Sequence, residues 1–187
     1  MTREMSITTS SPLTAVELEQ LSLPDKQVEL VRGRLLVREP PGSWHGRISA
    51  RLALRVGEYV QRHTLGDVFA QDTGFKIASD PDTVRAPDLA FVARDRMDRI
   101  ARRGYAELAP DLVVEVLSPD DRPGEVLAKV ADWLDAGTRL VWVIDPERLE
   151  ARVHRRDGTL SLLDGLASLD GEDVLPGFGC PLRDILA

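Results

Sequence analysis

The 187-residue sequence contains one cysteine, Cys180, and only three histidines. A lone cysteine excludes an intramolecular disulfide and is typical of a reducing compartment, so we expect a cytoplasmic protein. Three scattered histidines and one cysteine cannot supply a zinc site of the usual spacing. No apolar run approaches the roughly 18 residues that a transmembrane helix requires, and no membrane partner is predicted.

Lysine is also scarce, since Lys26, Lys76 and Lys129 stand against 21 arginines. The net charge is −7, which weighs against a broad, non-specific grip on nucleic acid. Hydrophobic residues make up 43% and charged residues 29%, as in a folded domain. We expect one domain over residues 12–187, preceded by a flexible Ser/Thr-rich segment, 1–11, without the apolar core of a secretory signal.

The apolar periodicity predicts a chain of mixed helices and strands. A capping box of Thr14 and Glu17 begins a short helix, and Ser43 is the expected N-cap of a long one. The predicted helices are 14–21, 43–63 and 123–136, and the predicted strands are a hairpin over 27–38 and the runs 68–78, 86–93, 112–117, 140–144 and 151–155. This order predicts an α/β (α+β) fold, a mixed sheet with helices packed on it.

Two carboxylates lie within the most apolar segments. In the run 111–117, Glu115 shares a strand face with Val113 and Leu117. Asp88 opens a second apolar run. A buried carboxylate must be compensated by a metal ion, a cation or a proton. Hard oxygen ligands favour Mg²⁺ or Mn²⁺, so the pair predicts a divalent-metal site.

Three further residues have both a structural and a functional interpretation. Lys129 flanks the apolar stripe of the 123–136 helix, either as a stem covering the core edge or as an ammonium near the reacting phosphate. His45 lies on the inward face of the 43–63 helix, as a hydrogen-bonded core residue or a functional one. Glu29 alternates with apolar neighbours, on the wet face of the hairpin or as a third acid.

Five arginines crowd residues 94–103, with Asp95 and Asp98 between them. One interpretation is a solvated helix face with i,i+4 pairs such as Asp95–Arg99. The other is a phosphate-contacting lobe beside the acids.

Several short motifs follow one another in a particular order: Val28-Glu29-Leu30-Val31-Arg32-Gly33, His45, Pro87-Asp88, Val114-Glu115-Val116-Leu117-Ser118-Pro119, Lys129 and Val141-Trp142-Val143-Ile144-Asp145-Pro146. This pattern, over roughly residues 14–180, resembles the Uma-type putative restriction-endonuclease family of the PD-(D/E)XK nuclease superfamily. The resemblance implies a restriction-endonuclease-like αβββαβ core with an added N-terminal hairpin and a C-terminal strand extension. One departure is that Leu117 stands where the superfamily usually has its lysine, and Lys129 matches the position to which that lysine has migrated in this family.

The resemblance also implies metal-assisted hydrolysis of phosphodiester bonds, with DNA as the expected nucleic-acid partner. Asp88, Glu115 and a backbone carbonyl near Val116 would hold Mg²⁺ or Mn²⁺, and Lys129 would orient the attacking water. Glu29 would complete the acidic cluster, and His45 would contact the phosphate or relay a proton.

Two other functions stay open at the level of the sequence: a degenerate nuclease fold serving as a binding or structural module, and a metal-dependent phosphoesterase acting on something other than DNA. A homodimer is also left open, because cutting both strands is simplest with paired sites.

Overall fold

The computed structural model describes residues 5–7, 11–21 and 23–187. Its strands are β1 (Met5–Ile7), β2 (Gln27–Val31), β3 (Arg34–Arg38), β4 (Gly66–Ala70), β5 (Phe75–Ala78), β6 (Thr83–Arg85), β7 (Leu89–Ala93), β8 (Leu112–Val116), β9 (Leu140–Asp145), β10 (Glu150–Arg155), β11 (Leu160–Leu163), β12 (Ser168–Asp170) and β13 (Gly179–Pro181). Its helices are α1 (Ala15–Gln20), α2 (Ser43–His63), the 3₁₀ helix η1 (Arg94–Arg99), α3 (Pro123–Asp135) and α4 (Leu182–Leu186).

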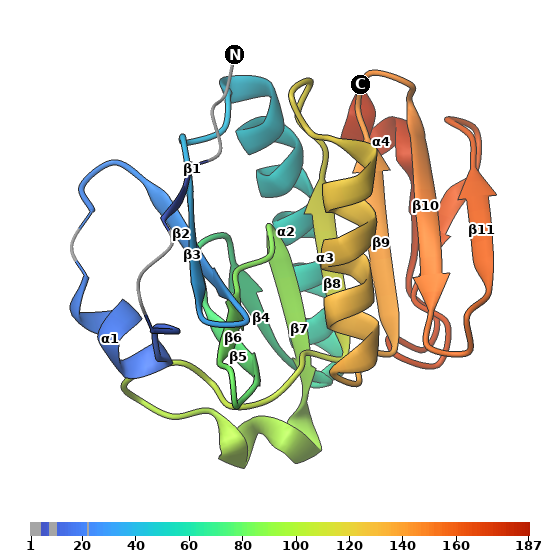
Figure 1. Cartoon of the computed structure of the whole chain (residues 1–187). Helices are drawn as coiled ribbons and strands as arrows, with labels where there is room; N and C mark the ends of the chain where they lie inside the picture. The colour runs from blue at the N-terminus through green and yellow to red at the C-terminus, as the bar shows by residue number, and fades with distance from the viewer. Residues whose placement is uncertain (1–4, 8–10, 22) are drawn as a thin grey trace.

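A six-stranded mixed sheet forms the centre of the molecule, in the order β11-β10-β9-β8-β7-β4 (Figure 1). Strands β8 and β9 pair in parallel, and α3 makes the crossover between them. The other neighbours pair antiparallel. Every residue of β8 and β9 is buried, which explains why their sequences are nearly continuous apolar runs.

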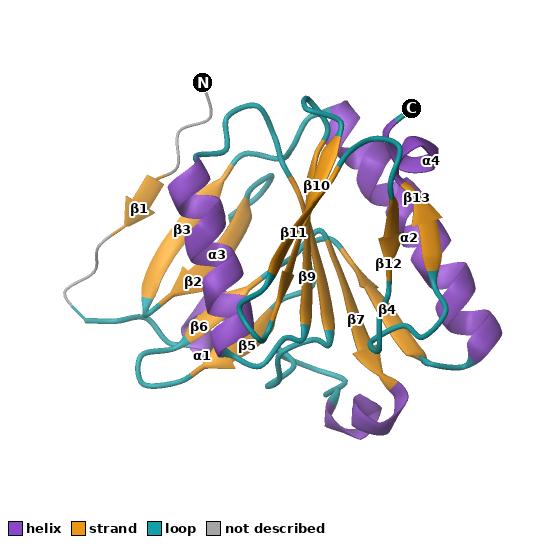
Figure 2. Ribbon diagram, turned by 90° about the vertical axis from the view of Figure 1, so that its right-hand side faces the viewer, coloured by secondary structure: helices purple, strands orange, loops and turns teal. Residues whose placement is uncertain are grey.

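Helices cover both faces of this sheet (Figure 2). On one face α2 and α4 pack through an apolar cluster that includes Ile48, Leu52 and Ile185. On the other face α3 packs through Val130 and Trp133 against β7, β8 and β9. The predicted mixed sheet with helices packed on it is therefore confirmed.

A second sheet, in the order β1-β3-β2-β6-β5, lies beside the first and contains the predicted hairpin (Figure 1). Its apolar cluster is small and includes Leu18 of α1, Leu30 and Val84. Residues 86–88 connect β6 of this sheet to β7 of the large one. The two sheets therefore meet at the segment that contains Asp88.

Most of the predicted elements are confirmed, with two local corrections. The capping box of Thr14 and Glu17 is present at α1. However, Ser43 is the first residue of α2 rather than its N-cap, which is Gly42 with no side-chain hydrogen bond. The run 68–78 is not one strand, because β4 ends at Ala70 and β5, in the other sheet, begins at Phe75.

The segment 1–11, predicted as flexible, is described only in part, since residues 1–4 and 8–10 lie outside the described residues. Within it, Met5–Ile7 forms β1 and pairs with β3. Across the described residues, no helix combines the length and apolar character needed to cross a bilayer.

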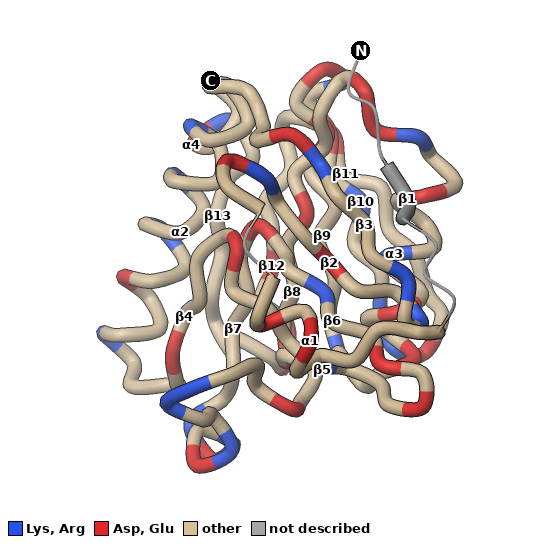
Figure 3. The backbone as a smooth tube through the Cα atoms, turned by 60° about the vertical axis from the view of Figure 1, so that its left-hand side comes forward, with Lys and Arg blue, Asp and Glu red and all other residues tan. Residues whose placement is uncertain are grey.

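The arginine-rich segment lies away from Asp88, beyond the opposite end of β7. Arg96 pairs there with buried Asp111, at 2.7 Å from Nη1 to Oδ1. Residues 94–103 do not line the cleft described below, so their interpretation as a lobe beside the acids is wrong. Along the backbone as a whole, basic and acidic residues are interspersed (Figure 3).

Candidate active site

A cleft of about 790 Å³ lies between the two sheets. The small sheet and its β3–α2 loop contribute Glu29, Arg38 and Glu39, and the large sheet with α3 contributes Glu115 and Lys129. Acidic residues outnumber lysine and arginine in its lining by eight to four, the four being Lys26, Arg38, Arg122 and Lys129. Five of the residues predicted from the sequence, Asp88, Glu115, Lys129, Glu29 and His45, line this one cleft, as does Val116.

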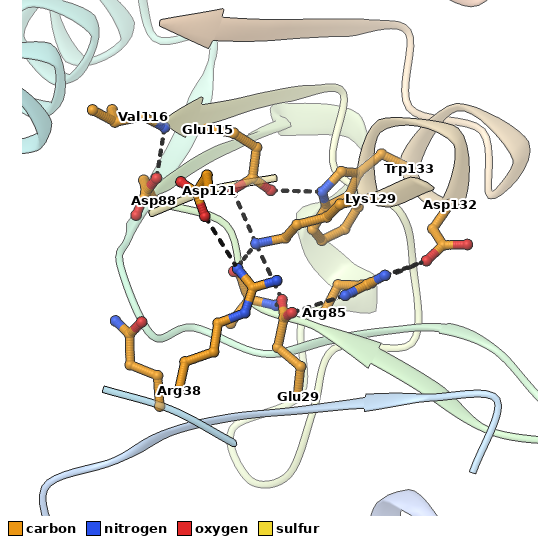
Figure 4. A network of polar contacts seen from close by, with 12 residues as sticks. Glu29, Arg38, Arg85, Asp88, Glu115, Val116, Asp121, Lys129, Asp132 and Trp133 are labelled. Atoms are coloured by element: carbon orange, nitrogen blue, oxygen red, sulfur yellow. Dashed lines mark hydrogen bonds and ion pairs between the residues drawn. The ribbon is translucent and has the colours of Figure 1, made fainter. Parts of the chain in front are cut away.

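Asp88 is fixed at the entrance to β7. Its N–H donates to the Val114 carbonyl (3.1 Å), and its Oδ2 accepts from the Val116 N–H (2.7 Å) and lies 3.1 Å from His45 Nε2. The N–H and carbonyl of a strand residue point toward the same neighbouring strand, so the Val116 carbonyl also lies on the Asp88 side of β8. Asp88 is thereby held beside the backbone of β8 (Figure 4).

Glu115 lies on the face of β8 that α3 covers. Its Oε1 accepts from Trp133 Nε1 and its Oε2 from Lys129 Nζ, both at 2.9 Å. Because Lys129 and Trp133 are four residues apart on α3, one helix face supplies both donors. The predicted burial of Glu115 is confirmed, with 8% of the residue exposed.

The pKa of Glu115 is raised to about 7. Burial is the largest cause, and the charges of Asp88 and Glu29 add to it, while Lys129 acts in the opposite direction. Glu115 is therefore only partly ionised near neutral pH.

The Lys129 ammonium lies in the middle of the polar network (Figure 4). Its Nζ donates to the Ala86 carbonyl and to Glu115, both at 2.9 Å, and is 3.2 Å from Oε1 of Glu29. Burial lowers its pKa, but the nearby carboxylates, Glu115 first, raise it above the usual value. A side chain that is 11% exposed and bound to three oxygens does not snorkel, so the interpretation of Lys129 as a surface stem is wrong.

Glu29 is buried, with 6% of the residue exposed, so it does not lie on a wet face of the hairpin. Its Oε1 accepts from the Ala86 N–H (2.8 Å), and its Oε2 accepts from Arg85 Nη1 (2.9 Å). Burial raises its pKa, but the charges of Lys129 and Arg85 outweigh that effect and lower the pKa to about 2. Glu29 is therefore ionised and has donors on both oxygens.

Arg85 anchors this arrangement and was not singled out by the sequence. Its guanidinium bridges Glu29 and Asp132 of α3, with Nη2 2.6 Å and Nε 3.0 Å from Asp132 Oδ2. Arg85 is 4% exposed. A signal was present, because an arginine inside the short apolar stretch before Pro87 must find an acidic partner if it is buried.

His45 lies in the first turn of α2 and is buried, facing inward as predicted. Burial lowers its pKa, but the hydrogen bond to Asp88 and the charges of Asp88 and Asp121 outweigh burial and raise it. A protonated His45 donates to Asp88 and fixes the orientation of that carboxylate.

Two comparisons with known proteins found similarity to this chain. The sequence model of Uma2, described as "Putative restriction endonuclease", matches residues 15–183. The chain belongs to the Uma2 family. Its fold is similar to the crystal structure of a putative nuclease belonging to DUF820 from Anabaena variabilis ATCC 29413, with a TM-score of 0.80 and 21% identity, covering 94% of this chain and 98% of that one. A search of curated proteins found no match.

Restriction-endonuclease-like families such as Uma2 generally use divalent metals, and the donor chemistry of the cleft fits such an ion. Within the described part of the chain, no group of three or more His, Cys, Asp and Glu side chains has the arrangement of a metal site. Mg²⁺ does not need one, because it commonly takes one or two carboxylates and keeps several waters. Asp88 lies just before β7 and Glu115 lies on the adjacent strand β8, so a cation between them would favour the ionised form of Glu115.

Proposed function

We propose that the chain is a metal-dependent endonuclease that hydrolyses phosphodiester bonds in DNA, with Mg²⁺ or Mn²⁺ as cofactor. The observation that carries the proposal is the convergence of Asp88, Glu115 and Lys129 on one cleft of a nuclease-like fold. Membership of the Uma2 family supports the same reaction class.

In this proposal Asp88, Glu115 and the Val116 carbonyl hold the ion. When bound, the ion lowers the pKa of a coordinated water and offsets charge on the phosphoryl oxygens. His45 keeps Asp88 oriented through its 3.1 Å contact. Trp133 similarly holds one oxygen of Glu115 in place.

Lys129 acts on the substrate in this scheme. One of its three N–H groups turns from Glu115 to the attacking water or to a non-bridging phosphate oxygen, where it stabilises the charge that develops. Glu29 already pairs with two cations, Arg85 and Lys129, so we assign it to holding Lys129 rather than to binding an ion. Arg85 holds Glu29 from behind.

A second candidate function is hydrolysis of a phosphoester other than DNA. It is favoured by the acidic lining of the cleft and the net charge of −7, both of which repel a long polyanion. A degenerate fold that serves only as a binding or structural module is disfavoured, because Asp88, Glu115 and Lys129 are all present and line one cleft.

The test is calorimetric titration of Mg²⁺ and Mn²⁺ into the wild type and Glu115→Ala, with nicking of supercoiled plasmid assayed on the same samples. Glu147→Ala, which removes an exposed carboxylate, is the matched control. We expect binding and nicking in the wild type and the control, and loss of both in Glu115→Ala. Metal binding without nicking of any plasmid would favour the second candidate. A wild type that binds neither ion, with or without DNA, would refute the metal-dependent proposal.

A further inference from the structure

Arg38 lines the cleft at the end of β3, on the sheet opposite Asp88 and Glu115. Its side chain is 28% exposed, and Nη1 lies 4.0 Å from Oδ1 of Asp121, which belongs to the loop between β8 and α3. Figure 4 shows the guanidinium extending from the hairpin toward Asp121. The ion pair therefore crosses the mouth of the cleft, from the small sheet to the large one.

The other cations of the cleft are more closely paired than Arg38. Lys129 contacts three oxygens, and Lys26 is bonded to Glu39. Arg122 points to solvent, 82% exposed, with Glu125 at 3.4 Å. Arg38 is half-buried and faces the cleft. Among the described residues it has one ion pair, at the outer limit of ion-pair distance, and its charge also acts on Glu29. Most of its donor capacity is thus available to an incoming anion.

Asp121 does not depend on Arg38 for its conformation. Its Oδ2 accepts from the Ser118 N–H at 2.8 Å and so closes the turn of its own loop. Only Oδ1 approaches the guanidinium. The loop therefore stays intact when the contact with Arg38 is lost. Asp121 can thus release Arg38 to another anion without a change in its own conformation.

We propose that Arg38 is a phosphate-binding residue of the cleft and that Asp121 is its resting partner, displaced when a nucleic-acid phosphate arrives. The planar guanidinium offers two parallel N–H donors that match the non-bridging oxygens of a phosphodiester. Asp121 lowers the affinity of the resting protein for anions, because it competes for the same donors. This inference rests on the proposed function and assigns a substrate contact to it.

The experiment measures binding of a fluorescein-labelled DNA duplex by anisotropy, across a salt series, in buffer with Ca²⁺ and in buffer with EDTA. Arg38→Ala is expected to weaken binding roughly tenfold and to reduce the salt slope by about one. Arg38→Lys should restore the salt slope but only part of the DNA affinity. Lysine keeps the positive charge but lacks the two parallel N–H donors of the guanidinium. Arg34→Ala is the matched control, an exposed arginine at the start of the same strand.

Asp121→Asn supplies the second arm. As a single substitution, Asp121→Asn should tighten DNA binding several-fold. Combined with Arg38→Ala it should have no effect, because the guanidinium for which Asp121 competes is already absent. An equal gain in DNA affinity with and without Arg38 would show that Asp121 acts only through its negative charge, and this would overturn the inference. Identical salt slopes for Arg38→Ala and Arg34→Ala, or no DNA binding by the wild type, would overturn it as well.

Failure of this inference is distinguishable from failure of the proposed function. Arg38-dependent DNA binding by a wild type that never nicks plasmid would refute the endonuclease and leave the phosphate contact standing. Nicking that continues with unchanged KM and unchanged binding in Arg38→Ala would refute the phosphate contact alone. Thermal unfolding of each variant shows whether the fold is intact.

Discussion

At the scale of single residues, each buried charge of the cleft belongs to a network that reaches across the two sheets. Glu29 of the small sheet holds Lys129 of α3, which in turn contacts Glu115 of the large sheet. Breaking one buried pair typically costs about 3–5 kcal/mol because the remaining charge stays buried. Removing any one member of the network should therefore destabilise the fold.

Glu29 makes the free energy of unfolding depend on pH in the acid range. Its pKa is about 2 in the folded protein against an ordinary 4.5, so its contribution is complete above pH 4.5 and is lost as the pH falls toward 2. The shift corresponds to about 3 kcal/mol. Urea unfolding between pH 6 and 3 should show a steeper loss of unfolding free energy in the wild type than in Glu29→Gln.

Parallel pH profiles for the two proteins would contradict this prediction. An NMR titration of the Glu29 carboxyl carbon provides an independent measurement that does not require the variant to fold. Its midpoint should lie below pH 3. Glu115 acts in the opposite direction, because its raised pKa makes metal-free stability fall as the pH rises from 4.5 to about 7.

Sequence alternation was enough to predict that Glu115 is buried, and helical periodicity placed His45 inward. Helical periodicity could not decide whether Lys129 snorkels to solvent or binds buried acceptors, because the partners Glu29 and Ala86 come from distant segments. Arg85 escaped prediction for the same reason. Its acceptors, 56 positions before it and 47 after it, are brought close only by the fold.

At the scale of elements, α2 connects core packing with the site. Its apolar face, including Leu52 and Val56, packs on the large sheet, while His45 in its first turn contacts Asp88. The position of the histidine is thus set by the apolar contacts made further along the same helix.

Leu52→Ala tests this packing, with Leu54→Ala as the control on the opposite face of α2. Leu52 is fully buried and Leu54 is 68% exposed. We expect Leu52→Ala to lower the unfolding free energy by about 2–5 kcal/mol, through lost burial and a residual cavity. Leu54→Ala should change it by less than about 0.5 kcal/mol. Urea unfolding measures both, and equal effects would show that α2 is not packed in this orientation.

The elements themselves were largely predictable, because long periodic segments carry their own signal. The run 68–78 was the exception. Gly74 marks the break, but only tertiary pairing assigns β4 to β7 in one sheet and β5 to β6 in the other. Pairing between strands that lie far apart in the sequence cannot be predicted from the local residues alone.

At the scale of the whole molecule, two unequal cores share one cleft. The large sheet has an extensive apolar cluster on each face. Among the described residues, the small sheet has a cluster of its own with six buried members, and its strand β5 also packs through Phe75 into the cluster under α3. The six are Ala15, Leu18, Leu30, Leu35, Val37 and Val84. Regions with few buried apolar contacts open at lower free energy than the global core. The small sheet is therefore the less stable half of the site.

Native-state hydrogen exchange should resolve this difference. Amides of β2 and β3 are expected to exchange at least tenfold faster than amides of β8 and β9, and a divalent ion that binds the cleft should narrow the gap. Mass spectrometry of peptides that cover each strand measures both effects. Uniform protection across the two sheets would mean that the molecule opens as a single cooperative unit.

The polar network of the cleft also has a consequence during synthesis. Glu29 is made early, whereas the ammonium of Lys129 and the indole of Trp133 come a hundred residues later. A nascent chain that ends before α3 would have to bury Glu29 and Glu115 without the lysine that pairs with both. Such a truncated chain therefore lacks both the charge that compensates the two buried acids and one of the residues proposed for the reaction.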